Sequence, residues 1–208
     1  PQGVDINGST VIIRDCVFTG NLKIEGNSSV EMINSTCVNL DVSGSKLHAV
    51  DSVFAAVTTT GDSNITLVDS NFTTGSFTSG LVFLKDSVAS AAVSFNASTW
   101  RAHGSTFKDN LTSTNSHTNL FRSTVEKAFS HVGSSKDCVI YQSTLGRVSG
   151  HELFSDANRT WVTYSDVHHV SHAGGAEAYF IKNRFLTDKN KNFSPISANG
   201  PNCKYFIN

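Results

Sequence analysis

Histidine and carboxylate side chains gather between residues 126 and 177 of this 208-residue chain. Histidine titrates near neutral pH and can act as a general acid or base. A pair of carboxylates flanking a glycosidic bond is the usual machinery for cleaving a polysaccharide. The stretch therefore predicts a site that binds or cleaves a sugar polymer. The candidate catalytic residues are His151, Glu152, Asp166, His172 and Glu177.

Histidine and aromatic residues of the same stretch are the candidates for binding a ligand. They are His131, Tyr141, Trp161 and Tyr179. Counted within the repeat described below, His131, His151 and His172 fall within one residue of each other on successive repeats. Aromatic rings pack against flat apolar surfaces, including the faces of sugars, but they also fill cores and interfaces. A column of one residue type is likewise a normal filling for a repetitive interior, so a structural role is the alternative for both groups.

A metal site is not expected. His168 and His172 have ligand spacing only if they lie on a helix, and we expect strand or loop there. The four cysteines show neither CxxC spacing nor the density of a disulfide framework. The sequence predicts no cofactor.

A repeat of about 18 residues runs through the chain and must position these side chains. It is clearest at one column, here called the anchor column, in which eight of ten positions are serine. The steps between successive anchors are 19, 17, 18, 17, 18, 18, 20, 22 and 18 residues. The column consists of Cys16, Ser35, Ser52, Ser70, Ser87, Ser105, Ser123, Ser143, Ser165 and Asn183.

Apolar residues alternate with a period of two before each anchor, as in Val11 and Ile13 or Ile65 and Leu67. This period is typical of β-strands. Another apolar column lies two residues after the anchor. The first five anchors are each preceded by Asp or Asn, namely Asp15, Asn34, Asp51, Asp69 and Asp86. Such residues suit tight corners. A short repeat of strands and polar turns predicts a solenoid in which each repeat is one coil, about 4.8 Å above the last.

The phrase V-x-I-x-D/N-S-x-F resembles the coil consensus of right-handed parallel β-helices of the pectate-lyase and phage-tailspike kind, over residues 9 to 186. The resemblance implies an all-β, single-stranded right-handed parallel β-helix of about ten coils at residues 1–186. A left-handed helix would need an aliphatic residue every six positions, and that spacing is absent. Residues 187–208 depart from the repeat and are expected to form an irregular cap or a linker to a missing domain.

Enzyme signatures of the β-helix families do not fit. Polygalacturonases carry a paired Asp-Asp, which this chain lacks, although Gly150-His151-Glu152 resembles part of their Gly-His-Gly motif. Pectate lyases use a calcium-binding carboxylate cluster, and no compact acidic group is present. The sequence leaves open whether the chain is an enzyme.

Apolar residues also occupy strand positions that should face solvent, including Ile12, Ile33, Phe83 and Trp161. A strand that is apolar on both faces is usually covered on both faces. We therefore expect a partner, most simply identical copies, and the tailspike resemblance implies a homotrimer. The alternative is that good strand formers simply lie on the surface.

Composition narrows the function classes. The net charge of −1 gives no electrostatic argument for nucleic acid, and no apolar run reaches the roughly 18 residues that span a membrane. Nine Asn-x-Ser/Thr motifs predict a secreted glycoprotein if the host is eukaryotic. They begin at Asn7, Asn27, Asn34, Asn64, Asn71, Asn96, Asn110, Asn158 and Asn192.

The leading interpretation is the β-helical portion of a phage or viral tail spike or fibre that binds, and in some cases degrades, a host cell-surface polysaccharide. It predicts an extracellular or virion-surface location. The alternatives are a secreted polysaccharide lyase, hydrolase or epimerase, and a purely structural shaft or adhesin stalk.

Overall fold

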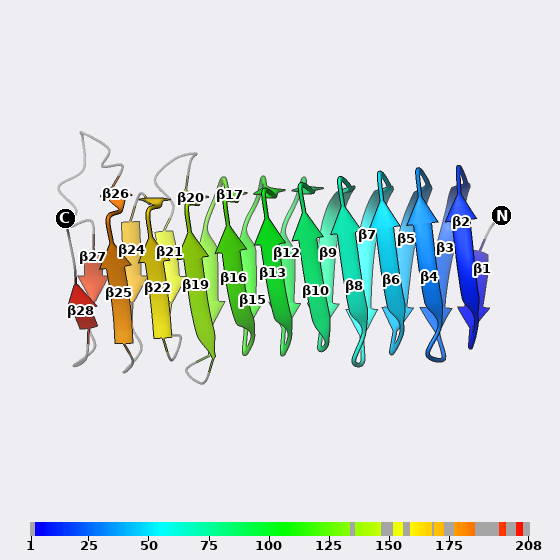
Figure 1. Ribbon diagram of the computed structural model, residues 1–208, viewed down its shortest axis with the longest axis horizontal. Coiled ribbons are helices and arrows are strands. Elements are labelled where there is room, and N and C mark those ends of the chain that lie inside the picture. The colour runs from blue at the N-terminus through cyan, green and yellow to red at the C-terminus, as the bar shows by residue number, and fades with distance from the viewer. Residues whose placement is uncertain are drawn as a thin grey trace.

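The computed structural model describes residues 3–133, 136–146, 152–155, 159–167, 169–172, 177–185, 196–198 and 203–205, with the backbone alone at 152–155, 169–172, 196–198 and 203–205. All elements in these ranges are β-strands. They wind into a right-handed parallel β-solenoid of about nine turns. The molecule is an elongated rod, with the N-terminal coil at one end and the C-terminal coil at the other (Figure 1).

Sheet 1 runs along one side of the solenoid and has eleven strands in order along the rod. Its strands are β2 (Thr10–Arg14), β4 (Ser29–Ile33), β6 (Lys46–Val50), β8 (Asn64–Val68), β10 (Leu81–Lys85), β13 (Thr99–His103), β16 (His117–Phe121), β19 (Asp137–Tyr141), β22 (Arg159–Thr163), β25 (Glu177–Ile181) and β28 (Cys203–Tyr205).

Sheet 2 covers the other sides of the coil and has seventeen strands, because each coil supplies one long strand or two short ones. The long strands are β3 (Val17–Glu25), β5 (Thr36–Ser43), β7 (Val53–Thr60) and β9 (Asn71–Thr78). The others are β1 (Gly3–Asn7), β11 (Val88–Ala89), β12 (Val93–Asn96), β14 (Thr106–Phe107), β15 (Leu111–Thr114), β17 (Thr124–Val125), β18 (Phe129–Val132), β20 (Thr144–Leu145), β21 (Glu152–Ser155), β23 (Asp166–Val167), β24 (His169–His172), β26 (Arg184–Phe185) and β27 (Ile196–Ala198).

The predicted coil register is confirmed. Strands of sheet 1 pair in parallel, for example Thr10 with Ser29 and Lys46 with Asn64. The strand-to-strand steps equal the steps of the anchor column, including the longer coils of 20 and 22 residues. The apolar columns read from the sequence point inward and form one continuous core.

The C-terminal segment departs in part from the expected irregular cap. β27 pairs in parallel with β24, and β28 with β25, so each sheet gains one more strand beyond residue 186. The remainder of 187–208 lies outside the described residues.

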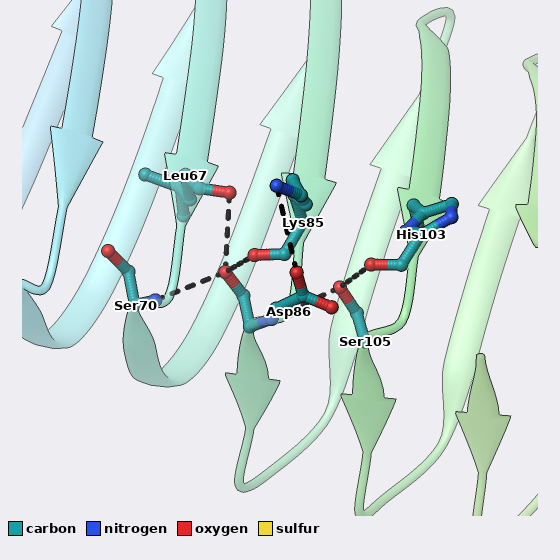
Figure 2. Close-up of polar contacts among 7 residues, drawn as sticks. Leu67, Ser70, Lys85, Asp86, His103 and Ser105 are labelled. Atoms are coloured by element: carbon teal, nitrogen blue, oxygen red, sulfur yellow. Dashed lines mark hydrogen bonds and ion pairs between the residues drawn. The ribbon is translucent and has the colours of Figure 1, made fainter. Parts of the chain in front are cut away.

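The anchor serines form a hydrogen-bonded ladder along one corner of the solenoid (Figure 2). Each hydroxyl accepts the backbone N–H of the anchor one coil earlier, as Ser87 Oγ does from Ser70 at 3.2 Å. It donates to the carbonyl two residues before it, as Ser87 does to Lys85 at 2.8 Å. Asn183 replaces serine at the last rung, where its side-chain oxygen accepts the Ser165 N–H at 2.9 Å. The ladder satisfies buried amides that the corner leaves outside the sheet pairing.

The residue before each anchor adopts a left-handed backbone conformation, with φ between 46° and 63° at all ten corners. This region costs an ordinary L-residue roughly 1–2 kcal/mol, and Gly, Asn and Asp tolerate it best. Asp15, Asn34, Asp51, Asp69 and Asp86 hold the first five corners. Their predicted role as corner residues is confirmed.

A second serine ladder follows the opposite corner. The Ser9 and Ser28 amides donate to Ser28 Oγ and Ser45 Oγ at 3.2 and 3.1 Å. The Ser98 amide likewise donates to Ser116 Oγ at 3.0 Å. Two ladders on opposite corners hold the spacing of the coils on both sides of the core.

Aromatic rings stack in the middle of the core. Phe95 lies between Phe77 and Trp100, with ring centroids 4.9 and 4.2 Å away and interplanar angles of 11° and 7°. Gly75 makes room for this stack, because a Cβ there would lie 2.6 Å from Phe77 Cε2. Packing of this kind gives the rod a solid interior on which surface residues are held in fixed register.

Candidate functional site

The corner of the C-terminal half carries side chains unlike those of the N-terminal half. Four successive corner positions, here called the corner ridge, are Arg122, Gln142, Tyr164 and Lys182, and all four are exposed. Arg122 Nε donates to Gln142 Oε1 at 3.0 Å. Lys182 Nζ lies 5.6 Å from the centroid of the Tyr164 ring. The ridge is therefore an ordered row of cationic, amide and phenolic groups.

The corner ridge is held in a costly backbone conformation. Arg122, Gln142, Tyr164 and Lys182 have φ of 49°, 49°, 51° and 51°. The six preceding corners use Asp, Asn or Gly, which accept this conformation more readily. Residues kept in strained conformations gather at functional sites, where their side chains are needed. The ridge therefore contains four residues on successive coils whose backbone conformation is unfavourable for their residue types.

An aromatic stack runs beside the ridge on the outer face of sheet 1. Phe121 stacks between His103 and Tyr141, with centroid distances of 4.9 and 5.2 Å and interplanar angles of 22° and 3°. Neighbouring rings cover each other's faces, so this stack presents ring edges outward. Tyr164 differs, because its ring is turned 67° from that of Tyr141 and is attached to a residue that is 51% exposed. It is the aromatic side chain of this region with the largest open surface among the described residues.

A second aromatic pair lies on the same face of the last coils. The Trp161 and Tyr179 rings stack with centroids 5.8 Å apart, and the Arg159 guanidinium carbon lies 5.2 Å from the Trp161 centroid. Arg159 also binds Asp137 through two hydrogen bonds of 3.1 and 2.8 Å. This hydrogen-bonded carboxylate raises the pKa of Arg159. The cluster is partly buried and internally paired, so its rings are fixed in place.

Hydrogen bonding also fixes the polar end of that pair. The Tyr179 hydroxyl donates to Glu177 Oε2 at 2.9 Å, and the bond raises the pKa of Tyr179. Tyr141, Trp161 and Tyr179 are thus brought to one outer face, as the sequence predicted for outward positions. Contact with a ligand stays a prediction for all three.

His131 lies inside the core. Its side chain is fully buried, and Nε2 lies 2.9 Å from the Ser116 carbonyl oxygen. The proposed stacking of His131 with His151 is wrong. In the register of sheet 2, His131 pairs with Ser155, and Ser155 pairs with His172. This register arises because the extra residues of the 22-residue coil come before β21, the strand that contains Ser155. A ligand on the surface of a single chain therefore does not reach the His131 ring.

The structure does not bring the candidate catalytic carboxylates together. Asp166 lies in β23 of sheet 2 and forms an ion pair with Arg184, whereas Glu177 lies in β25 of sheet 1 and binds Tyr179. His151 and the side chains of Glu152 and His172 lie outside the described residues. Catalysis by any of these groups stays a prediction without a supporting arrangement in the described part.

Sequence reasoning missed the corner ridge, although its signal is visible in the sequence. The residue before the anchor changes from Asp or Asn in the first five coils to Arg, Gln, Tyr and Lys in the last four. Each residue looks like an ordinary surface side chain alone. That these four residues adopt an unfavourable backbone conformation becomes apparent only from their φ angles in the structure.

The described residues contain neither a metal-binding cluster nor a membrane-spanning helix. No group of three or more His, Cys, Asp or Glu is arranged there to hold a metal ion. No helix in the same ranges is long and apolar enough to cross a membrane. Compared with known proteins, the chain matches no family model, no curated protein and no solved structure.

Proposed function

We propose that this chain is the rigid β-helical part of a surface attachment protein, such as a viral or phage tail spike or fibre, and that it binds polysaccharide through the corner ridge. The observation that carries the proposal is the row of four large polar side chains kept in a left-handed conformation. Aromatic surface with a few fixed polar groups is typical of ligand sites. Tyr164 offers the open ring, and Arg122, Gln142 and Lys182 offer hydrogen-bond donors along the rod.

The test of this proposal uses the unfavourable backbone conformation of Tyr164. Replacing Tyr164 with Gly removes the ring and relieves the backbone, so polysaccharide binding should fall while thermal stability is kept or raised. Affinity electrophoresis against dextran, xylan, hyaluronan and bacterial lipopolysaccharide would identify a ligand. For the polymer that binds, we expect Tyr164→Gly to weaken affinity about tenfold, equivalent to about 1.4 kcal/mol.

Asp86→Gly is the matched control, because it makes the same backbone change at an acidic corner of the N-terminal half. Its affinity should equal that of the parent protein. Equal affinity of parent and Tyr164→Gly would contradict the proposed role of the ridge.

Self-association belongs to the same proposal. Ile12 is 59% exposed on the outer face of sheet 1, where three copies packed about a common axis would cover it. Light scattering should then give three times the chain mass of 22.3 kDa. A monomer that releases reducing sugar ends from the bound polymer would favour the secreted-enzyme alternative.

A purely structural shaft is the second candidate. The two serine ladders favour it, since they stabilise the rod without forming any site. In that case no polymer binds, and glycine at all four ridge positions raises stability with no functional loss.

A further inference from the structure

The Asn-x-Ser/Thr motifs are not used by the proposed function. Seven of the nine lie in the described part, and all seven asparagines are exposed. Three of the seven also form side-chain hydrogen bonds, from Asn7 to Glu25, from Asn34 to Asp15 and from the Ala128 amide to Asn110. Exposure alone therefore does not single out one motif.

The serine ladders explain only two of these motifs. The hydroxyl residues Ser9 and Ser98 belong to the second ladder, so the motifs at Asn7 and Asn96 follow from the architecture. At Asn64 the hydroxyl residue is Thr66, which lies on the outer face of β8 and takes no part in either ladder. Architecture gives no reason for a hydroxyl there.

Asn64 has a distinctive surface around it. It borders each of three adjoining shallow depressions on the outer face of sheet 1, with volumes of about 530, 490 and 420 Å³. Leu81, its register neighbour on the next coil, is 53% exposed, and Phe83 is 38% exposed. An exposed asparagine thus lies at the edge of an open apolar patch.

We propose that Asn64 is an N-glycosylation site whose attached sugars cover Leu81 and Phe83. In the reaction, Asn64 Nδ2 loses a proton and bonds to the anomeric carbon of an oligosaccharide carried on a lipid pyrophosphate. The bond from that carbon to the pyrophosphate oxygen breaks, and the lipid pyrophosphate leaves. The apolar faces of the first sugars then lie over the patch, which would otherwise leave apolar surface open to solvent.

The experiment is secretion of the full chain from mammalian cells, followed by enzymatic removal of N-glycans in ¹⁸O water and peptide mapping. Glycosylated Asn64 is expected to appear as ¹⁸O-labelled aspartate. Thr66→Ala should abolish the label at Asn64, and Thr66→Ser, which keeps the motif, should retain it. An unmodified Asn64 in secreted protein whose other motifs carry glycans would overturn the proposal.

The covering of the patch has its own readout. Removal of the glycans should increase binding of a hydrophobic dye to the native protein, and Leu81→Ser with Phe83→Ser should remove most of that increase. The same double substitution at Val17 and Val53, which are exposed on strands β3 and β7 of sheet 2, should leave the increase unchanged. Equal increases in both double variants would contradict the covering role.

Discussion

At the residue scale, single serine hydroxyls hydrogen-bond the backbone of adjacent coils at the corners. Ser87 Oγ accepts from the Ser70 amide, donates to the Lys85 carbonyl at 2.8 Å and lies 3.2 Å from the Leu67 carbonyl oxygen. The net value of each such bond is about 1 kcal/mol, but a buried amide left without a partner costs about 1–3 kcal/mol. Replacing a ladder serine therefore costs more than the hydrogen bond itself contributes, because the buried amide loses its acceptor.

Ser87→Ala should destabilise the protein by about 1–3 kcal/mol, because the buried Ser70 N–H then lacks an acceptor. Urea unfolding measures the loss, and amide exchange at Ser70 should accelerate. Ser94→Ala, at an exposed position of β12, is the control and should change stability little. Similar losses in both variants would show that the ladder is not the cause.

Buried cysteines make stability fall in alkaline solution. Burial raises the pKa of the Cys138 thiol, with a smaller contribution from Asp137, and burial also raises the pKa of Cys37. Above the ordinary cysteine pKa of about 8.5 the unfolded chain releases these protons and the folded chain keeps them, so the free energy of unfolding declines as pH rises.

Cys138→Val should reduce that decline. The measurement is the free energy of unfolding between pH 7 and pH 10 for both proteins. A decline of the same slope in the variant would assign the pH dependence to other groups.

Residue-level prediction succeeded where chemistry repeats and failed where it does not. The corner role of Asp15 through Asp86 was readable because five coils share it. The pairing of His131 with Ser155 was not, because the sequence does not show where the extra residues of the 22-residue coil lie. Counting from an anchor is reliable only up to the first insertion.

At the scale of elements, register was readable from the sequence because a parallel coil needs the same residue types above one another. The anchor column gave every step of sheet 1 from β2 to β25. The second ladder was missed although Ser9, Ser28, Ser45 and Ser63 repeat in the sequence, because Gly80 interrupts the serine column before it resumes at Ser98 and Ser116. The conformation of the corner ridge was not readable, because large polar residues normally avoid left-handed backbone.

The left-handed conformation at the corner between the sheets predicts which substitutions there reduce stability. Asp51→Val should cost about 1–2 kcal/mol, because a β-branched residue is poorly tolerated at φ of 50°. Asp51→Asn keeps a side chain suited to the corner and should stay near the parent value. Melting temperatures of the two variants compare them directly, and equal values would contradict the assigned strain.

At the scale of the whole molecule, each coil contacts mainly its neighbours, so damage should remain local. Trp100→Ala removes a buried ring that stacks on Phe95 and donates to Ser113 Oγ at 3.0 Å. We expect a loss of about 3–5 kcal/mol. Hydrogen exchange should increase most in β12, β13 and β15 and least in β2 and β4. A uniform increase along the rod would instead indicate one cooperative unit.

The ladder keeps its contact of 3.2 Å through coils of 18, 20 and 22 residues. Added residues therefore lengthen the perimeter of one coil and leave the spacing between coils at the ladder unchanged. A peptide epitope inserted after Asp62, in the exposed turn between β7 and β8, would project sideways at the level of that coil. Epitopes placed in several coils would be separated by multiples of the coil spacing of about 4.8 Å.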